Sequence, residues 1–248
     1  KAVFDNEDDA LFPNQFVNVR LRVSGGQVRA ASRAWMTPEG APLVAAARFG
    51  RSCHDGQLYA NVDGAHLETW SPLLQLAGIR MEQGQGRLQA WAEVRDARIA
   101  SVTGQAALED LALASTGPDT ARAETGFDRL DAELQWRQMV GGWRVDVPQL
   151  NLERDGQAWS ITGLSAQAGT HYALVAERIE AAPLLEILAL GDWVASGLQG
   201  WLRQAGPGAV LADVELAGMR GGPLRAAARV EGLAFAAVGD RPGLSGLR

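Results

Sequence analysis

The chain carries one pattern of residues twice. Residues 86–113 align without a gap on residues 208–235, with eight of the 28 positions identical and most others alike in polarity. Each copy follows a short apolar segment that contains a proline, Pro72 in the first case and Pro183 in the second. A repeated unit with one apolar face and one polar face stacks on its neighbours, because a single copy cannot bury its own apolar face. We therefore expect an elongated, modular protein rather than a compact enzyme.

Alternation of apolar and polar residues with a period of two runs through most of the sequence. In residues 88–94, Leu88, Ala90, Ala92 and Val94 alternate with the polar side of the segment, and the pattern returns in residues 17–23, 102–108, 130–136, 143–147 and 224–230. This period predicts strands with one buried face. Glycine-containing turns at 24–26, 140–142, 154–157 and 221–223 separate these runs. The fold class is thus mainly β, an antiparallel meander of roughly a dozen strands.

Two segments break the alternation. Residues 66–78 have apolar side chains at helical spacing and end on Gly78, a plausible helix C-cap. Residues 183–204 show a similar pattern with an interruption at Gly191, after which Asp192 is a candidate N-cap for a second short helix. Both segments are predicted to be short and amphipathic and to cover the end or one face of the sheet. The polar residues 115–126 are expected to form an exposed loop.

The whole chain, residues 1–248, is interpreted as a single elongated β-rich module with internal repeat units at about 58–113 and 172–235. It begins with Lys1 rather than Met, so we expect it to be a piece of a longer protein.

Composition excludes several classes of partner and site. The chain has 23 Lys and Arg against 29 Asp and Glu, a net charge of −6, and no basic run, so nucleic acid is not an expected partner. The single Cys53 cannot form an internal disulfide. No apolar run approaches the ~20 residues of a membrane-spanning helix, so no membrane span is expected in this sequence.

Catalytic and metal-binding patterns are not found in the sequence. His54, His66 and His171 never have the short spacing of a zinc site, and neighbours such as Cys53 and His54 point apart on a strand or turn. The carboxylates that strand pairing could bring together lie on the polar side of the alternation or beside turns: Glu93, Asp96, Glu109, Asp110, Asp131 and Glu133. The segment 84–86, Gly-Gln-Gly, lacks the third glycine of a dinucleotide-binding fingerprint and is interpreted as a turn. We expect no metal, no cofactor and no catalytic residue.

The eight tryptophans are a compositional excess. Trp136 and Trp143 flank one predicted hairpin and are expected on a single face. Cross-strand aromatic packing and an apolar platform for a ligand both account for these side chains.

The order of several weak motifs resembles a known family. From about Phe16 onward, the segments LETWSPLL, GRLQAWAEV, FDRLDAELQWR and GGWRVDVPQLNLERDGQAW follow one another, and APLLEILAL, GLQGWLRQAGPGAVLADV and VEGLAFAAVGDRPGLSGL come later. This order is similar to the central region of the YhdP-type members of the AsmA-like superfamily. The resemblance implies a large periplasmic protein that is anchored in the bacterial inner membrane and built as a long curved sheet with an apolar groove.

The resemblance also implies a function, the carriage of phospholipid toward the outer membrane, with flanking β modules of the same full-length protein as partners. Many apolar-face residues are alanine, and small side chains leave room for acyl chains on the floor of a groove, although an Ala-rich genome would give the same composition. The candidate groove residues are Leu88, Ala90, Ala92, Val94, Val102, Ala106, Leu108, Leu130, Ala132, Leu134, Trp136, Val145, Leu224, Ala226, Ala228 and Val230. A structural or adhesive β-repeat module with a filled interior is the alternative, and a carbohydrate-active enzyme is a third hypothesis.

Overall fold

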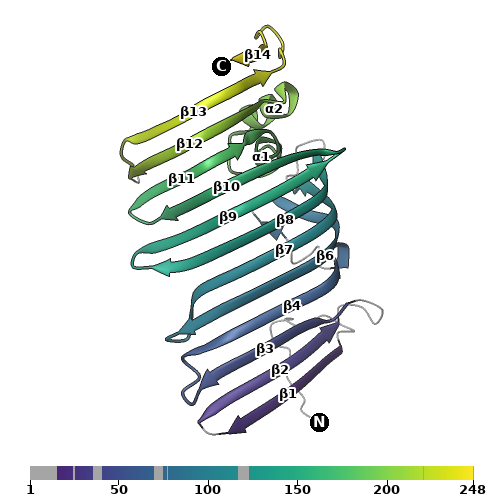
Figure 1. Cartoon of the computed structure of the whole chain (residues 1–248), viewed down its shortest axis with the longest axis vertical. Helices are drawn as coiled ribbons and strands as arrows, with labels where there is room; N and C mark the ends of the chain where they lie inside the picture. Colours follow the sequence, from purple (N-terminus) through teal and green to yellow (C-terminus); the bar gives the residue numbers. More distant parts are fainter. Residues whose placement is uncertain are drawn as a thin grey trace.

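The structure is one open antiparallel sheet with two short helices on one of its faces (Figure 1). A computed structural model describes residues 16–24, 26–35, 41–69, 75–76, 78–116, 123–219 and 221–247. The strands of this part are β1 (Phe16–Ser24), β2 (Gln27–Trp35), β3 (Leu43–Gly50), β4 (Gly56–His66), β5 (Gln75–Leu76), β6 (Ile79–Arg95), β7 (Arg98–Ser115), β8 (Glu124–Met139), β9 (Gly142–Arg154), β10 (Gln157–Ala168), β11 (His171–Glu180), β12 (Gly208–Met219), β13 (Leu224–Phe235) and β14 (Leu244–Leu247). The helices are the 3-10 turn η1 (Leu67–Thr69), α1 (Ala181–Leu188) and α2 (Ser196–Ala205).

Each strand pairs with its neighbours in sequence, so the predicted antiparallel meander is confirmed. The hydrogen-bonded order runs from β1 to β14 without a crossover, and the short β5 lies off this path beside β6. Four of the turns expected from glycines do join consecutive strands, at 24–27, 139–142, 154–157 and 219–224. The turn at Asp96 and Ala97 has no glycine, and both residues take a left-handed φ, 50° and 58°. Such a two-residue turn matches the twist of its flanking strands.

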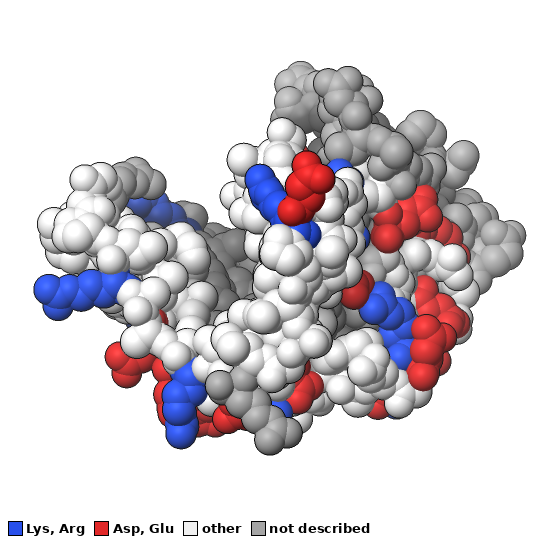
Figure 2. Space-filling view, turned by 90° about the horizontal axis from the view of Figure 1, so that it is seen from above, with Lys and Arg blue, Asp and Glu red and all other residues white. Residues whose placement is uncertain are grey.

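The strands bend because several of them contain an extra residue with left-handed φ. Gly64 in β4, Asp110 in β7, Gly163 in β10, Asp213 in β12 and Gly232 in β13 have φ between 50° and 73°. The pairing register shifts near Gly64, Asp110, Asp213 and Gly232, for instance between Asp63 and Ala65 and between Ala212 and Glu215. Gly163 has the same backbone conformation without a register shift. A bulge of this kind bends its strand and increases the local twist. The sheet consequently curls, and Figure 2 shows the molecule hollowed on one side when it is viewed down its long axis.

The helices lie on the apolar, concave face and close one side of it. Leu190, which follows α1, is buried with Leu108 and Leu152 from that face of the sheet. A second buried cluster joins Ala181 of α1 to Ile161 and Ile179. Of the described residues, no polar or charged residue is buried. The core therefore sits between the helices and the strand ends nearest to them, and it leaves the opposite strand ends uncovered.

The predicted helices are partly confirmed. The segment 183–204 does contain two helices, although α2 begins after Ala195 and Asp192 does not cap it. The expected helix over 66–78 is wrong in its described part, because Leu67–Thr69 form one 3-10 turn and Gln75–Leu76 form a strand, while residues 70–74 lie outside the described residues. Leu67 is only 1% exposed, so tertiary packing fixes this segment.

Two further boundaries differ from expectation. The glycines of segment 84–86 lie inside β6, so the interpretation of this segment as a turn is wrong. The expected loop 115–126 begins at the last residue of β7 and ends within β8, which starts at Glu124, and residues 117–122 lie outside the described residues.

Candidate functional site

The candidate groove residues lie on one face of the sheet. The register pairs Leu88 with Ala106, Ala106 with Ala132 and Ala132 with Leu150 across four strands. A parallel row joins Ala92, Val102, Trp136 and Val145. On β13, Ala226 pairs with Leu216, which pairs with Leu174 of β11. Because side chains opposite one another in register share a face, strand pairing brings these residues into one continuous apolar surface.

This surface contains an apolar hollow at its N-terminal end. The hollow has a volume of about 330 Å³ and is floored by Ala45, Ala47, Leu58, Ala60, Ala90 and Ala92 of β3, β4 and β6. These strands meet through alanines, since Ala45 pairs with Ala60 and Ala60 with Ala90. Alanine has no atoms beyond Cβ, so the floor stays low while the bent strands form the walls.

The concave surface has an open half and a filled half. In the open half Leu134, Trp143 and Leu224 are 39–56% exposed, although they are large and apolar. In the filled half Leu108 is only 3% exposed, and Leu88, Ala106 and Leu130 pack against the core that contains it. Val94 lies at the end of the open half, two residues after Ala92, and is nevertheless buried, at 9%. Figure 2 shows this hollow between two largely uncharged lobes, with charged side chains at its rims and along the outside.

One ion pair fixes α1 over the filled half. Arg154 at the end of β9 donates two hydrogen bonds to the carboxylate of Glu186, at 2.7 and 2.9 Å, and Thr125 donates a third to Glu186 Oε2 at 2.9 Å. The Arg154 guanidinium also lies 5.6 and 5.5 Å from the ring centroids of Phe127 and Trp159. Hydrogen bonding to Arg154 holds the pKa of Glu186 below its ordinary range, against the opposing effect of burial. A bidentate arginine–carboxylate pair is geometrically specific, so it sets where α1 sits.

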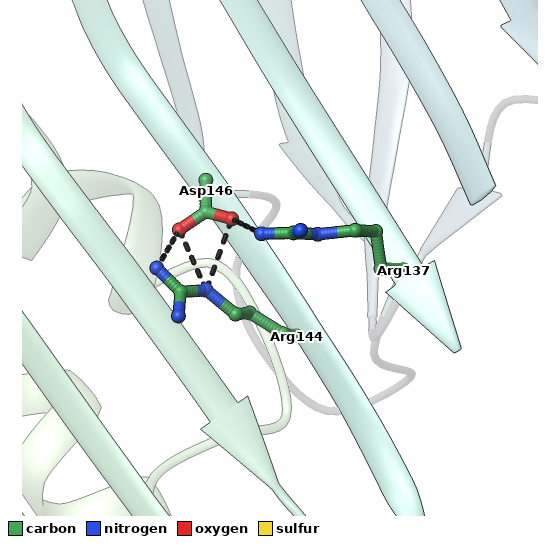
Figure 3. A network of polar contacts seen from close by, with 3 residues as sticks. All are labelled: Arg137, Arg144 and Asp146. Carbon is green, nitrogen blue, oxygen red and sulfur yellow. Dashed lines mark hydrogen bonds and ion pairs between the residues drawn. The ribbon is translucent and has the colours of Figure 1, made fainter. Parts of the chain in front are cut away.

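The opposite, convex face is polar and has its own ion pairs. Arg144 and Arg137 both donate to Asp146, with closest distances of 2.7 and 3.0 Å (Figure 3). The hydrogen bond from Arg144 lowers the pKa of Asp146 to about 2, assisted by Ser165 and Arg137 and opposed by burial. Further pairs on this face include Arg87 with Asp63 and Arg129 with Asp131. This network was not singled out in the sequence, where Arg137, Arg144 and Asp146 are ordinary polar-side residues.

The histidines and the carboxylates form no metal-binding group in the described part of the chain. Cys53 and His54 are exposed in the turn between β3 and β4, and His171 is exposed at the start of β11. No group of three or more His, Cys, Asp or Glu side chains capable of holding a metal ion occurs in the described ranges. Asp131 and Glu133 do line one hollow on the convex face, together with Arg87. Trp136 and Trp143 share the concave face, as the sequence predicted, because Trp136 pairs with Val145.

Comparison with family models covers almost the whole length of the sequence. The model described as YhdP protein matches residues 3–248. The chain belongs to the YhdP family. This assignment agrees with the resemblance carried by the motif order, and it places the YhdP chain among bacterial envelope proteins, in a family that is not a known enzyme family. Searches of curated proteins and of solved structures found no match.

No helix of the YhdP chain's described part is long and apolar enough to cross a membrane.

Proposed function

We propose that this chain is a non-enzymatic segment of a periplasmic bridge that carries phospholipid acyl chains along its concave face between the inner and outer membranes. The observation that supports the proposal most strongly is the open half of that face, where large apolar side chains stay exposed beside a floor of alanines. Soluble monomers rarely expose contiguous apolar surfaces of more than a few hundred Å² unless something binds there. Family membership favours the same function.

The shape of the concave face suits an acyl chain. It is a trough rather than an enclosed pocket, so a chain of methylene groups can lie along it and move without crossing a protein wall. In the described strands, Glu93 of β6 and Asp131 and Glu133 of β8 lie on the other face, because they alternate with the candidate groove residues. Removing apolar surface from water contributes roughly 25 cal/mol per Å², which favours lipid in this trough.

The two halves of the trough have different roles in this proposal: the filled half forms a wall, and the open half holds lipid. The core around Leu108 and the α1 helix closes one wall, and the ion pair of Arg154 with Glu186 holds that wall in place. Lipid would therefore run along the open half, past Ala92, Leu134 and Val145. A purely structural module would fill this half as well.

The proposal is tested by a matched pair of substitutions on one strand. Leu134→Asp and Gln135→Asp place the same charge at adjacent, exposed positions on opposite faces of β8. A charge at Leu134 would lie in hydrocarbon at a cost of several kcal/mol, whereas one at Gln135 would lie in water. Native mass spectrometry of the purified proteins should show bound phospholipid in the wild type and in Gln135→Asp, and much less in Leu134→Asp.

Photocrosslinking extends the same comparison along the sheet. A photoreactive residue at Ala92, Leu134 or Ala228 should label lipid, and one at Gln89, Thr103 or Gln135 should not. Equal labelling from both faces, or no labelling while the protein stays folded, would replace the lipid proposal with that of a structural module.

A further inference from the structure

The convex face carries a second surface that the lipid proposal does not use. Tyr59 of β4 lies directly opposite Trp91 of β6, with the ring centroids 5.4 Å apart and the rings tilted by 42°. Both side chains lie on the polar face, because Tyr59 and Trp91 alternate with Leu58 and Ala92 along β4 and β6, and Trp91 pairs with Thr103. Trp91 remains 39% exposed, so the pair leaves much of the indole in contact with water.

Two adjoining hollows flank this aromatic pair. The first, of about 630 Å³, includes Tyr59, Trp91, Thr103 and Ser101 in its lining. The second, of about 340 Å³, includes Gln89, Gln105, Gln149 and Asn151. They adjoin because Trp91 is two residues after Gln89 on β6 and Gln105 is two residues after Thr103 on β7, on the same face in each case. The lining of the two hollows runs from β2 to β9, and its hydroxyl and amide groups lie on β4, β6, β7 and β9 beside the aromatic pair.

The charges of this surface balance. Three arginines and three carboxylates line the two hollows together: Arg29, Arg48, Arg87, Glu93, Asp131 and Glu133. Several of them are already paired, Glu93 with Arg95 at 2.9 Å and Asp131 with Arg129 at 2.5 Å. A surface without excess charge gives no electrostatic advantage to a polyanion such as nucleic acid or an acidic polysaccharide.

We propose that this convex surface binds a neutral glycan chain. The C–H face of a pyranose ring is apolar and stacks on an exposed aromatic ring, while its hydroxyl and amide groups donate and accept hydrogen bonds. Glutamine and asparagine side chains each offer a hydrogen-bond donor and an acceptor, so they can pair with sugar hydroxyl and amide groups, which also donate and accept. A few convergent polar groups beside an apolar platform are the usual composition of a small-ligand site. Asp131 and Glu133 accept hydrogen bonds from sugar hydroxyls in this arrangement.

The inference is independent of the lipid proposal, because the two surfaces lie on opposite faces of one sheet. A bridge that contacts glycan on its outside while it carries lipid on its inside would be held at a fixed place in the envelope.

The test uses purified protein and two neutral hexasaccharides, chitohexaose and cellohexaose, with heparin as the anionic control. Titrations followed by tryptophan fluorescence and by calorimetry should show saturable binding of at least one neutral hexasaccharide and none of heparin. Trp91→Ala and Gln105→Ala should each weaken this binding at least tenfold. Trp143→Ala is the matched control, since Trp143 is 41% exposed on the concave face and should leave glycan binding unchanged.

The outcomes separate the two proposals. Trp91→Ala removes the Tyr59–Trp91 contact and can therefore destabilise the fold. The Gln105 side chain is exposed, so Gln105→Ala tests glycan binding in a protein that stays folded. Native mass spectra should show as much bound phospholipid in Gln105→Ala as in the wild type. This result would mean that loss of the glycan site leaves the trough intact. Absence of saturable binding by both neutral glycans, binding of heparin alone, or an equal effect of Trp143→Ala would overturn the proposal. Recovery of a protein partner that depends on Trp91 without any glycan binding would also overturn it and assign the surface to protein contact.

Discussion

At the scale of single residues, the convex face contains a carboxylate, that of Asp146, which receives two guanidinium groups. Arg144 and Arg137 reach it from two strands, and its pKa falls to about 2 (Figure 3). In the unfolded chain an aspartate titrates near 3.8. Its folded pKa is depressed, so this stabilisation is present above the unfolded value and is lost as the pH falls from about 4 toward about 2.

Asp146→Asn should lower the free energy of unfolding by about 1–2 kcal/mol at pH 7, since the hydrogen bonds would lose their charged acceptor. The difference from the wild type should shrink as the pH falls toward about 2, where the wild-type carboxylate also becomes neutral. Urea unfolding over a pH series measures both effects. Asp63→Asn is the control, because the Arg87–Asp63 pair is more than half exposed and such pairs contribute ~0.5 kcal/mol. An equal loss in both variants would show that the double contact adds nothing.

At the scale of secondary-structure elements, α1 is held by apolar packing and by one bidentate ion pair with Arg154. Glu186→Gln removes the charge that Arg154 binds and should raise hydrogen-exchange rates of the α1 amides about 5- to 30-fold, the equivalent of 1–2 kcal/mol. Mass spectrometry of peptides from residues 181–190 measures this change. Glu93→Gln, at an exposed pair with Arg95, should leave α1 unaffected. Unchanged exchange in Glu186→Gln would mean that apolar packing alone holds the helix.

The strands could be predicted from the sequence because the period of two depends only on neighbours along the chain, and residues 88–94 keep it throughout. The mistakes concern contacts between distant residues. Gly84 and Gly86 look like a turn, yet a Cβ at Gly86 would lie 2.1 Å from the carbonyl oxygen of Ala107 on the neighbouring strand, with φ at 145°. Glycine is required there by the approach of another strand. Leu67 likewise has helical spacing but is held by the core.

The candidate groove could be predicted only in part. Alternation places Leu108 and Leu134 on one face, as the register has them. It does not reveal that Leu108 is covered and Leu134 exposed, because that difference depends on α1 and on the bends of the strands. The aromatic pair on the convex face was equally hidden, since Tyr59 and Trp91 are 32 positions apart and meet through register.

At the scale of the whole molecule, stability is distributed unevenly along the sheet. The buried clusters draw on β4 and β6 to β12, whereas residues 224–232 of β13 are all exposed. In a sheet where each strand contacts only its neighbours, local stability follows local burial. Hydrogen exchange should be slowest in β7, β8 and β9 and fastest in β13 and β14. Uniform protection from β1 to β14 would show that the sheet unfolds as one cooperative unit.

The bends within the strands have a consequence for how such a molecule can grow. Gly64, Asp110, Asp213 and Gly232 each mark a bulge in their own strand, so the curvature of the trough is set within individual strands and not by closure of the whole sheet. Each such strand therefore carries its own bend. Duplication of a bent hairpin lengthens the trough and leaves its width unchanged. The length of the protein and the size of the ligand that it carries can therefore evolve separately.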